Sequence, residues 1–176
     1  MIFTDQQTQC FADWMEEHGA ILQKLSRAYA PEPVDEQDLL QEMRVQLWRS
    51  VPRFRNQAKP STWIYRVCLN TALTWRRTQR RREARVVNQP ESIEVATSED
   101  HNPACQQDRS DLMHSLMRSV RQLPATERSL IVLALDGLSY REISEVTGMT
   151  ENHIGVALNR ARKRLTQLLE EVSDEI

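Results

Sequence analysis

Hydrophobic residues recur every three or four positions through most of this 176-residue chain. No segment shows the alternation of apolar and polar residues that a half-buried strand would show. Prolines and glycines fall almost entirely between these helical patterns. A first helix is predicted over about 8–30, with an apolar set of Phe11, Trp14, Met15, Ile21, Leu22, Leu25 and Tyr29. The chain is therefore predicted to be all-α.

Two more helices are predicted in the N-terminal half. One begins at Asp35, a good N-cap, and ends near Ser50, and Pro31 and Pro33 are expected to break the chain before it. Its core stripe consists of Leu39, Leu40, Met43 and Leu47. The other is a long helix entered through Pro60, because proline fixes φ at the first helical position.

The long helix has two faces of different character. The face expected in a core consists of Ile64, Val67, Cys68, Thr71 and Trp75. The second face consists of Trp63, Arg66, Asn70, Thr74 and Arg77. An aromatic ring and an amide in line with arginines suit bases and phosphates, although a solvated helix with a charged tail is the alternative.

The C-terminal part predicts a helix-turn-helix. One helix ends at Pro124, and a second covers 125–135 and stops near Gly137. The segment 139–142, SYRE, is a capping box that starts a short helix, which Gly148 ends. Thr150 caps a last helix with the apolar stripe Ile154, Leu158, Ala161, Leu165, Leu168 and Val172. Two helices joined by a tight glycine turn are typical of DNA binding, and an ordinary helical hairpin is the alternative.

Residues 87–109 lack a sustained apolar period and contain prolines, hydroxyl residues and acids, so we expect a flexible acidic linker there. The expected organisation is two small helical domains, 1–86 and 110–176, on either side of it.

Charge is distributed very unevenly along the chain. The formal net charge is −2, yet residues 53–85 carry ten basic side chains and one acidic one. Residues 1–52 carry four basic and nine acidic side chains. The basic block predicts contact with a polyanion, and the acidic segments need another explanation. One acidic stripe follows the second helix as Asp38, Gln41, Glu42, Val45 and Arg49, and it is either solvated surface or a binding face.

Several classes of protein are disfavoured by what the sequence lacks. Three distant cysteines without C-x-x-C or histidine at zinc spacing predict neither a disulfide framework nor a metal site, and we expect no cofactor. Glu17 with His18 and Glu151 with His153 are isolated pairs, so an enzyme is not expected. The first residues do not look like a signal peptide, and no apolar run would span a bilayer, which predicts a cytoplasmic protein without membrane insertion.

The segments DEQDLLQEMRVQLW and VPRFRNQAKPSTWIYRVCLNTALTWRRTQRRR closely resemble region two of bacterial RNA polymerase sigma factors of the extracytoplasmic-function (ECF) group. The resemblance implies that the first motif binds the coiled coil of the polymerase clamp, through Asp38, Leu39, Gln41 and Glu42. It implies that the second motif begins the helix that engages the minus-ten promoter element, through Trp63, Arg66 and Asn70. The loop 54–62 falls where the family holds a base flipped from the non-template strand.

Further DNA contacts are expected around that helix. They are Lys59, Thr74, Arg76, Arg77 and Arg80. Arg66, Arg76, Arg77 and Arg80 are expected mainly to bind phosphate, and Asn70 to read a base. Lys59 followed by Pro60 departs from the family pattern and stiffens the loop. The resemblance also places the linker along the polymerase surface toward the RNA exit channel, and a passive tether is the alternative.

The segment LPATERSLIVLALDGLSYREISEVTGMTENHIGVALNRARKRL resembles sigma region four, whose helix-turn-helix binds the upstream minus-thirty-five element. Family members often carry a lysine and an arginine where this chain has Gly155 and Ala157. The expected DNA-contacting residues are Thr150, Asn152, His153, Val156, Asn159 and Arg160. The first two turns of the recognition helix, 151–158, contain no lysine or arginine, so few early phosphate contacts are expected.

The resemblance implies an ECF-type sigma factor that binds core RNA polymerase and directs it to promoter DNA. Whether an anti-sigma protein is a further partner stays open. One rival is a helix-turn-helix regulator that acts without polymerase, but it leaves the DLLQE stripe unexplained. The other is a sigma-like adaptor that binds only proteins, and it leaves the basic block unexplained.

Overall fold

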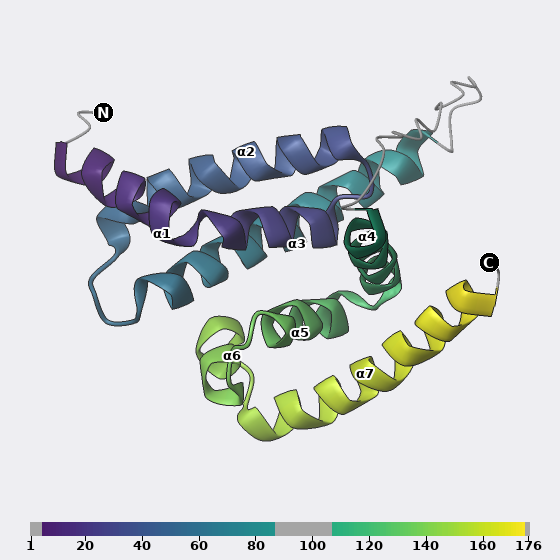
Figure 1. Cartoon of the computed structure of the whole chain (residues 1–176). Coiled ribbons are helices and arrows are strands. Elements are labelled where there is room, and N and C mark those ends of the chain that lie inside the picture. Colours follow the sequence, from purple (N-terminus) through teal and green to yellow (C-terminus); the bar gives the residue numbers. More distant parts are fainter. Residues whose placement is uncertain (1–4, 87–106, 175–176) are drawn as a thin grey trace.

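The computed structural model describes residues 5–86 and 107–174, and every element in these two ranges is helical (Figure 1). The elements are α1 (Asp5–Tyr29), α2 (Pro33–Ser50), the 3-10 turn η1 (Val51–Arg53), α3 (Pro60–Val86), α4 (Gln107–Gln122), α5 (Ala125–Leu135), α6 (Tyr140–Thr147) and α7 (Glu151–Asp174). The all-α prediction is confirmed. Most of the linker expected over 87–109 lies outside the described residues, and α4 begins at Gln107.

Helices α1, α2 and α3 lie roughly side by side and form the N-terminal half of the molecule (Figure 1). Their buried residues include Leu22, Leu25, Leu39, Met43, Leu47, Ile64, Cys68 and Ala72. Helices α4 to α7 form the C-terminal half around Leu123, Leu130, Leu133, Ile143, Ile154 and Leu158. The buried hydrophobic residues of both halves belong to one continuous cluster, so the two halves pack against each other.

The start of α2 differs from the prediction. Asp35 is not the N-cap, because the helix begins at Pro33 with Glu32 in the cap position and an extended backbone. Glu32 makes no side-chain capping bond. Pro33 occupies the first turn, where a missing N–H costs nothing, and Asp35 and Glu36 instead lie in the first turn, where they complement the helix dipole.

The buried ridge of α3 also differs in part. Ile64 and Cys68 are fully buried as predicted. Val67, Thr71 and Trp75 are only half-buried, because they line a groove between α2 and α3. Their places in the core are taken by Tyr65, Leu69 and Ala72, since α3 packs against α1 and α2 and also contacts α6.

The helix-turn-helix forms as predicted. Ser139 caps α6, its hydroxyl accepting from the backbone N–H of Glu142, while the Glu142 carboxylate accepts from the Ser139 backbone N–H. Gly148 ends α6 at a φ of 74°, a left-handed conformation that favours glycine. The Thr150 hydroxyl accepts from the backbone N–H of His153 at 3.4 Å and so caps α7.

Candidate polymerase and nucleic-acid interfaces

The acidic stripe of α2 is on the surface. Asp38, Gln41 and Glu42 are exposed, and Glu42 accepts a hydrogen bond from Gln46 at 2.7 Å. Leu39, which the family motif includes, is fully buried. Leu39 therefore anchors the helix and presents its neighbours, while the charged and amide side chains face outward.

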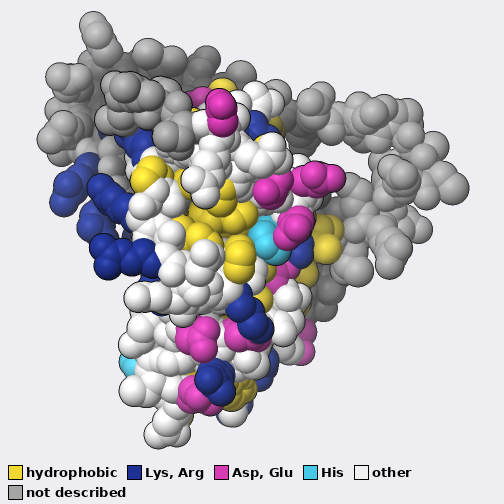
Figure 2. Space-filling view, turned by 90° about the vertical axis from the view of Figure 1, so that its left-hand side faces the viewer, with side chains coloured by type: hydrophobic (Ala, Val, Ile, Leu, Met, Phe, Trp, Pro, Cys, Tyr) yellow, Lys and Arg dark blue, Asp and Glu magenta, His cyan; other side chains and the backbone are white. Residues whose placement is uncertain are grey.

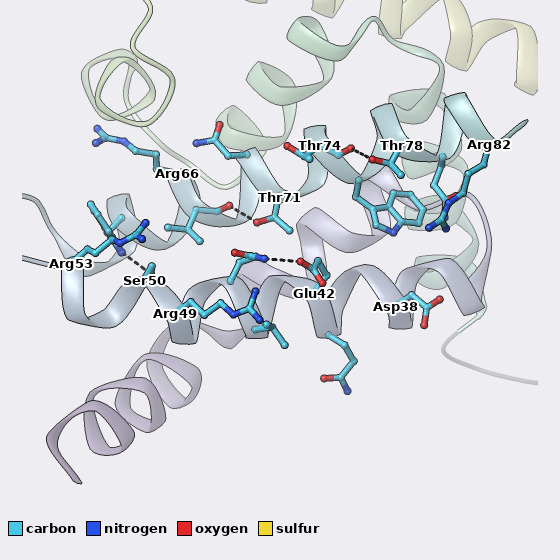
Figure 3. A pocket seen from close by; sticks show the side chains of 18 residues that line it. Asp38, Glu42, Arg49, Ser50, Arg53, Arg66, Thr71, Thr74, Thr78 and Arg82 are labelled. Carbon is cyan, nitrogen blue, oxygen red and sulfur yellow. Dashed lines mark hydrogen bonds between the residues drawn. The ribbon is translucent and has the colours of Figure 1, made fainter. Parts of the chain in front are cut away.

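The same stripe forms one wall of a groove between α2 and α3 with a volume of about 990 Å³ (Figure 3). Asp38 and Glu42 line it from α2, and Arg66, Asn70 and Thr74 line it from α3. The Thr71 and Thr78 hydroxyls donate to backbone carbonyls one turn back in α3, so they make local bonds on this wall. Part of each expected set thus shares one groove, on opposite walls, whereas Lys59, Arg76, Arg77 and Arg80 lie outside its lining.

The Trp63 ring is held in place by two contacts, so it is not free to reorient toward a base. Its indole N–H donates to the Ser50 hydroxyl at 3.0 Å, and its ring lies 5.8 Å from that of Phe54. Phe54 in turn packs edge-on against Trp14 at 5.1 Å. This series of three rings fixes the loop that leads into α3 relative to the core.

A second, smaller cavity of about 460 Å³ lies under that loop. Its lining is Arg53, Phe54, Arg55, Gln57, Ala58, Trp63, Arg66 and Glu145. The backbone of Asn56 has a φ of 54°, which asparagine tolerates better than most residues. The cavity lies where the family resemblance expects a flipped base, but Glu145 from α6 of the C-terminal half contributes to its wall.

Two of the expected DNA-binding cations already have protein partners. The Lys59 ammonium lies 3.0 Å from the Glu142 carboxylate, and the Arg66 guanidinium donates to the backbone carbonyl of Glu145. The Ser139 backbone N–H and then Lys59 lower the pKa of Glu142 to about 2, so this carboxylate is charged at neutral pH.

The basic end of α3 divides into two groups. Arg77 and Arg80 are exposed, as phosphate-binding residues should be. Arg76 is half-buried. Burial is the main cause that lowers the pKa of Arg128 in the C-terminal half, and the positive charges of Arg76 and Arg80 lower it further. On the upper half of the face in Figure 2, most Lys and Arg side chains gather along the left edge, and Asp and Glu lie to the right of a central hydrophobic patch.

On α7 the expected base-reading residues share an exposed face. Asn152, His153, Val156 and Asn159 are all exposed, as are Thr150 and Arg160. Val156 is 57% exposed, so its side chain is available on this face. Gly155 is half-buried, and a Cβ built there would meet the Tyr140 ring at 3.5 Å, an ordinary contact. Ala157 is buried, so a long side chain at that position would displace its neighbours.

Sequence reasoning missed the polar contacts between the two halves. Asp136, at the C-terminal end of α5, accepts from the Tyr65 hydroxyl at 2.5 Å and pairs with Lys24. Burial, followed by the bond to Asp136, raises the pKa of Tyr65 well above its usual value. The Tyr29 and Ser129 hydroxyls lie 2.6 Å apart. These single polar residues have no periodicity, so no sequence signal indicated them.

Neither a metal site nor a membrane span is found in the described ranges. Within 5–86 and 107–174, no three His, Cys, Asp or Glu side chains come together as metal ligands would. Every helix there falls short of the length and apolarity that a bilayer crossing needs.

Comparison with known proteins matches both halves of the chain. The sigma-70 region 2 family model matches residues 14–82, and the sigma-70 region 4 family model matches residues 113–165. The ECF RNA polymerase sigma-E factor of Escherichia coli K12 is 30% identical over 139 residues, which cover 74% of this chain and 72% of that protein. ECF sigma factor SigE of Mycolicibacterium smegmatis is 28% identical over 165 residues, which cover 92% of this chain but only 62% of that longer protein.

Two solved structures share the fold. CnrH, in complex with the cytosolic domain of CnrY, gives a TM-score of 0.63 at 21% identity, covering 93% of this chain and 90% of that one. The sigma factor RpoE of Bartonella quintana, in complex with the anti-sigma factor NepR, gives 0.65 at 20% identity, covering 90% and 97%. With both family models matched in order, and with an ECF relative 30% identical over most of both chains, this chain belongs to the sigma-70 family and is an ECF-type sigma factor.

Proposed function

We propose that this sigma factor docks on core RNA polymerase through Asp38, Gln41 and Glu42 and engages the minus-ten element through α3. The groove between α2 and α3 supports this most directly, because it places an exposed acidic stripe opposite Arg66, Asn70 and Thr74. A partner seated on the α2 wall would lie next to DNA held on the α3 wall.

The two kinds of DNA contact have different roles. Arg77 and Arg80 are exposed cations that neutralise phosphates and fix the register without reading sequence. Asn70 is an exposed side-chain amide on the groove wall, and an amide can pair with a base edge. The cavity under the 54–59 loop, with Arg53 and Arg66 in its lining, suits an unstacked base and its phosphate.

The C-terminal helix-turn-helix reads the minus-thirty-five element through the exposed face of α7. Asn152, His153 and Asn159 offer hydrogen-bonding groups to the major groove, and Val156 offers a methyl surface for a thymine. Arg160 and Thr150 flank this face and would contact the phosphate backbone of the DNA. We assign residues 1–86 and 110–176 as the two functional domains and 87–109 as the linker between them.

Three broader assignments accompany this function. The protein acts where the polymerase acts, in the cytoplasm, and it positions DNA rather than catalysing a reaction itself. The RpoE structure contains an anti-sigma factor and the CnrH structure contains CnrY, which supports an anti-sigma protein as a further partner of this chain.

The test is co-purification with core RNA polymerase followed by run-off transcription on a library of promoters. The expected result is a stoichiometric complex that initiates from a subset of the library, while core polymerase alone does not. A chain that binds promoter duplex but never the polymerase would instead be a free-standing regulator. A chain that binds polymerase without directing initiation would be an adaptor.

A further inference from the structure

The loop over the smaller cavity is closed at its base by one side-chain hydrogen bond. Ser50 is the last residue of α2, and Trp63 lies in the first turn of α3, 13 positions further along the chain. The Trp63 indole N–H donates to the Ser50 hydroxyl at 3.0 Å (Figure 3). Through this bond Ser50 acts on a cavity whose lining does not include it.

The hydrogen bonds of Ser50 fix the orientation of the Trp63 ring. The Ser50 hydroxyl has one proton, which it donates to the Leu47 carbonyl at 2.7 Å, so toward the indole it acts as an acceptor. Within 5–86 and 107–174, the indole N–H has no other protein acceptor. Ser50 is only 9% exposed, so water has little room to take its place. A Trp63 ring that turned away would leave its N–H without a partner, which costs free energy.

The Trp63 ring forms part of the wall between two cavities. Trp63, Arg53 and Arg66 line both the groove between α2 and α3 and the smaller cavity under the loop. Asn70 lines only the groove, and Gln57 lines only the smaller cavity. A movement of the ring would therefore change the shape of the smaller cavity while leaving the far end of the groove as it is.

We propose that Ser50 is a positioning residue for promoter recognition: it holds the Trp63 ring as the wall between the groove and the loop cavity, and so keeps that cavity shaped for one unstacked base. The inference rests on the proposed function, which assigns the loop cavity to a base. A cavity of fixed shape rejects a wrong base through clashes and unpaired groups, whereas a cavity with a moving wall adapts to it. Ser50 thus acts on base preference and leaves polymerase binding unchanged.

The test is Ser50→Ala in the full chain, assayed by run-off transcription with core polymerase on a library randomised over the minus-ten element. Discrimination at a position is the ratio of transcript from its best base to transcript from its worst. Gln57→Ala identifies the position that the cavity reads, because Gln57 lines this cavity and not the groove. There Ser50→Ala should lower discrimination about 5-fold, the effect of roughly one hydrogen bond. At the position that Asn70→Ala relaxes, Ser50→Ala should keep wild-type discrimination.

Ser26→Ala is the matched control. Ser26 is a buried serine of α1 whose hydroxyl also donates to the carbonyl three residues back, that of Gln23 at 2.9 Å. Both substitutions remove this kind of local bond, and only Ser50→Ala also removes the acceptor of an indole N–H. Ser26→Ala should therefore keep wild-type discrimination at every position, and thermal melting reports the stability that each substitution costs.

A double-mutant cycle determines whether Ser50 acts through Trp63. Trp63→Phe keeps an aromatic wall and removes the indole donor, so it should lower discrimination at the same position, and adding Ser50→Ala to it should lower discrimination no further. Ser50→Thr and Ser50→Val form a second pair, nearly identical in shape, of which only the first keeps the hydroxyl. Ser50→Thr should retain discrimination and Ser50→Val should lose it, which decides the question if Ser50→Ala does not fold.

Several results would overturn the proposal. They are wild-type discrimination in Ser50→Ala, a loss spread evenly over all positions or shared by Ser26→Ala, additive effects in the cycle, and equal behaviour of Ser50→Thr and Ser50→Val. If Gln57→Ala relaxes no position, the cavity reads no base and the proposal also falls. Failure of the proposed function looks different, because wild type would then give no promoter-specific transcript with core polymerase.

Discussion

The two helices proposed to face DNA, α3 and α7, offer it different chemistry. Helix α3 ends in a dense group of arginines, and two cations near its start, Lys59 and Arg66, are engaged by the C-terminal domain. The exposed face of α7 consists of amides, an imidazole and a methyl group, with cations only from Arg160 onward. Phosphate contacts provide affinity without sequence information, and base contacts provide discrimination. Under the proposed function, α3 would therefore supply affinity, and α7 would depend on the polymerase to hold it near its site.

The largest expected effect concerns the polymerase, without which α7 should find no promoter. Asp38→Lys with Glu42→Lys places cations on the α2 wall of the groove. A polymerase surface that complements the two carboxylates would then face like charges, which cost several kcal/mol across an interface. Polymerase binding should fall by about 100-fold or more. Co-purification and a binding titration measure it. Glu16→Lys with Glu17→Lys on α1 changes the net charge equally and should leave binding intact; equal loss in both would indicate a nonspecific charge effect.

The next effect separates affinity from discrimination on α3. Arg77→Ala removes an exposed cation, so transcription should fall to a similar extent at every promoter of a library. The plot of log binding constant against log salt concentration for the full chain should also become shallower, by about 0.9 in slope. Selective loss at some promoters would mean that Arg77 reads bases.

Adding a cation, rather than removing one, tests the absence of lysine and arginine from the first two turns of α7. Gly155→Lys adds a cation to the early turns, so binding of the full chain to any duplex should tighten, and the salt slope should steepen by about 0.9. Filter binding at several salt concentrations measures both. Gly155→Ala adds no charge and should leave the slope unchanged. A slope that does not respond to lysine would show that this turn of α7 lies away from phosphates.

The smallest effect is on stability. Gly155 lies inside a helix with room for a methyl group beside the Tyr140 ring, so Gly155→Ala should stabilise the protein by roughly 0.5–1 kcal/mol. Gly148→Ala is the contrasting substitution, because its φ of 74° disfavours a side chain, and it should destabilise. Thermal melting of both variants measures these changes. A Gly155→Ala variant less stable than wild type would show that the fold needs the missing side chain at this position.

The sequence predicted the helices of the C-terminal half well because local signals agree there. The capping box at Ser139, the left-handed Gly148 and the cap at Thr150 each act within a few residues. At the start of α2 two local signals competed, since Pro33 and Asp35 both suit a helix start, and the proline occupies the earlier position.

The groove and the interface between domains could not be predicted in the same way. A helical wheel assigns one buried face to α3, but α3 is covered from more than one side, which buries Tyr65 and leaves Trp75 in the groove. The contacts of Tyr29 and Asp136 join residues between 71 and 112 positions apart. They depend on how the two halves pack, which no local pattern contains.

The most direct test of the division between α3 and α7 is run-off transcription on a library with randomised minus-ten and minus-thirty-five elements. Asn70→Ala and Asn159→Ala are compared with wild type, all with core polymerase. A good base contact discriminates by about 1–3 kcal/mol, or roughly 5- to 150-fold. Asn70→Ala should relax preference at one downstream position only, and Asn159→Ala at upstream positions only. An even loss of activity across the library, or relaxation in the wrong element, would contradict the assignment of the two helices.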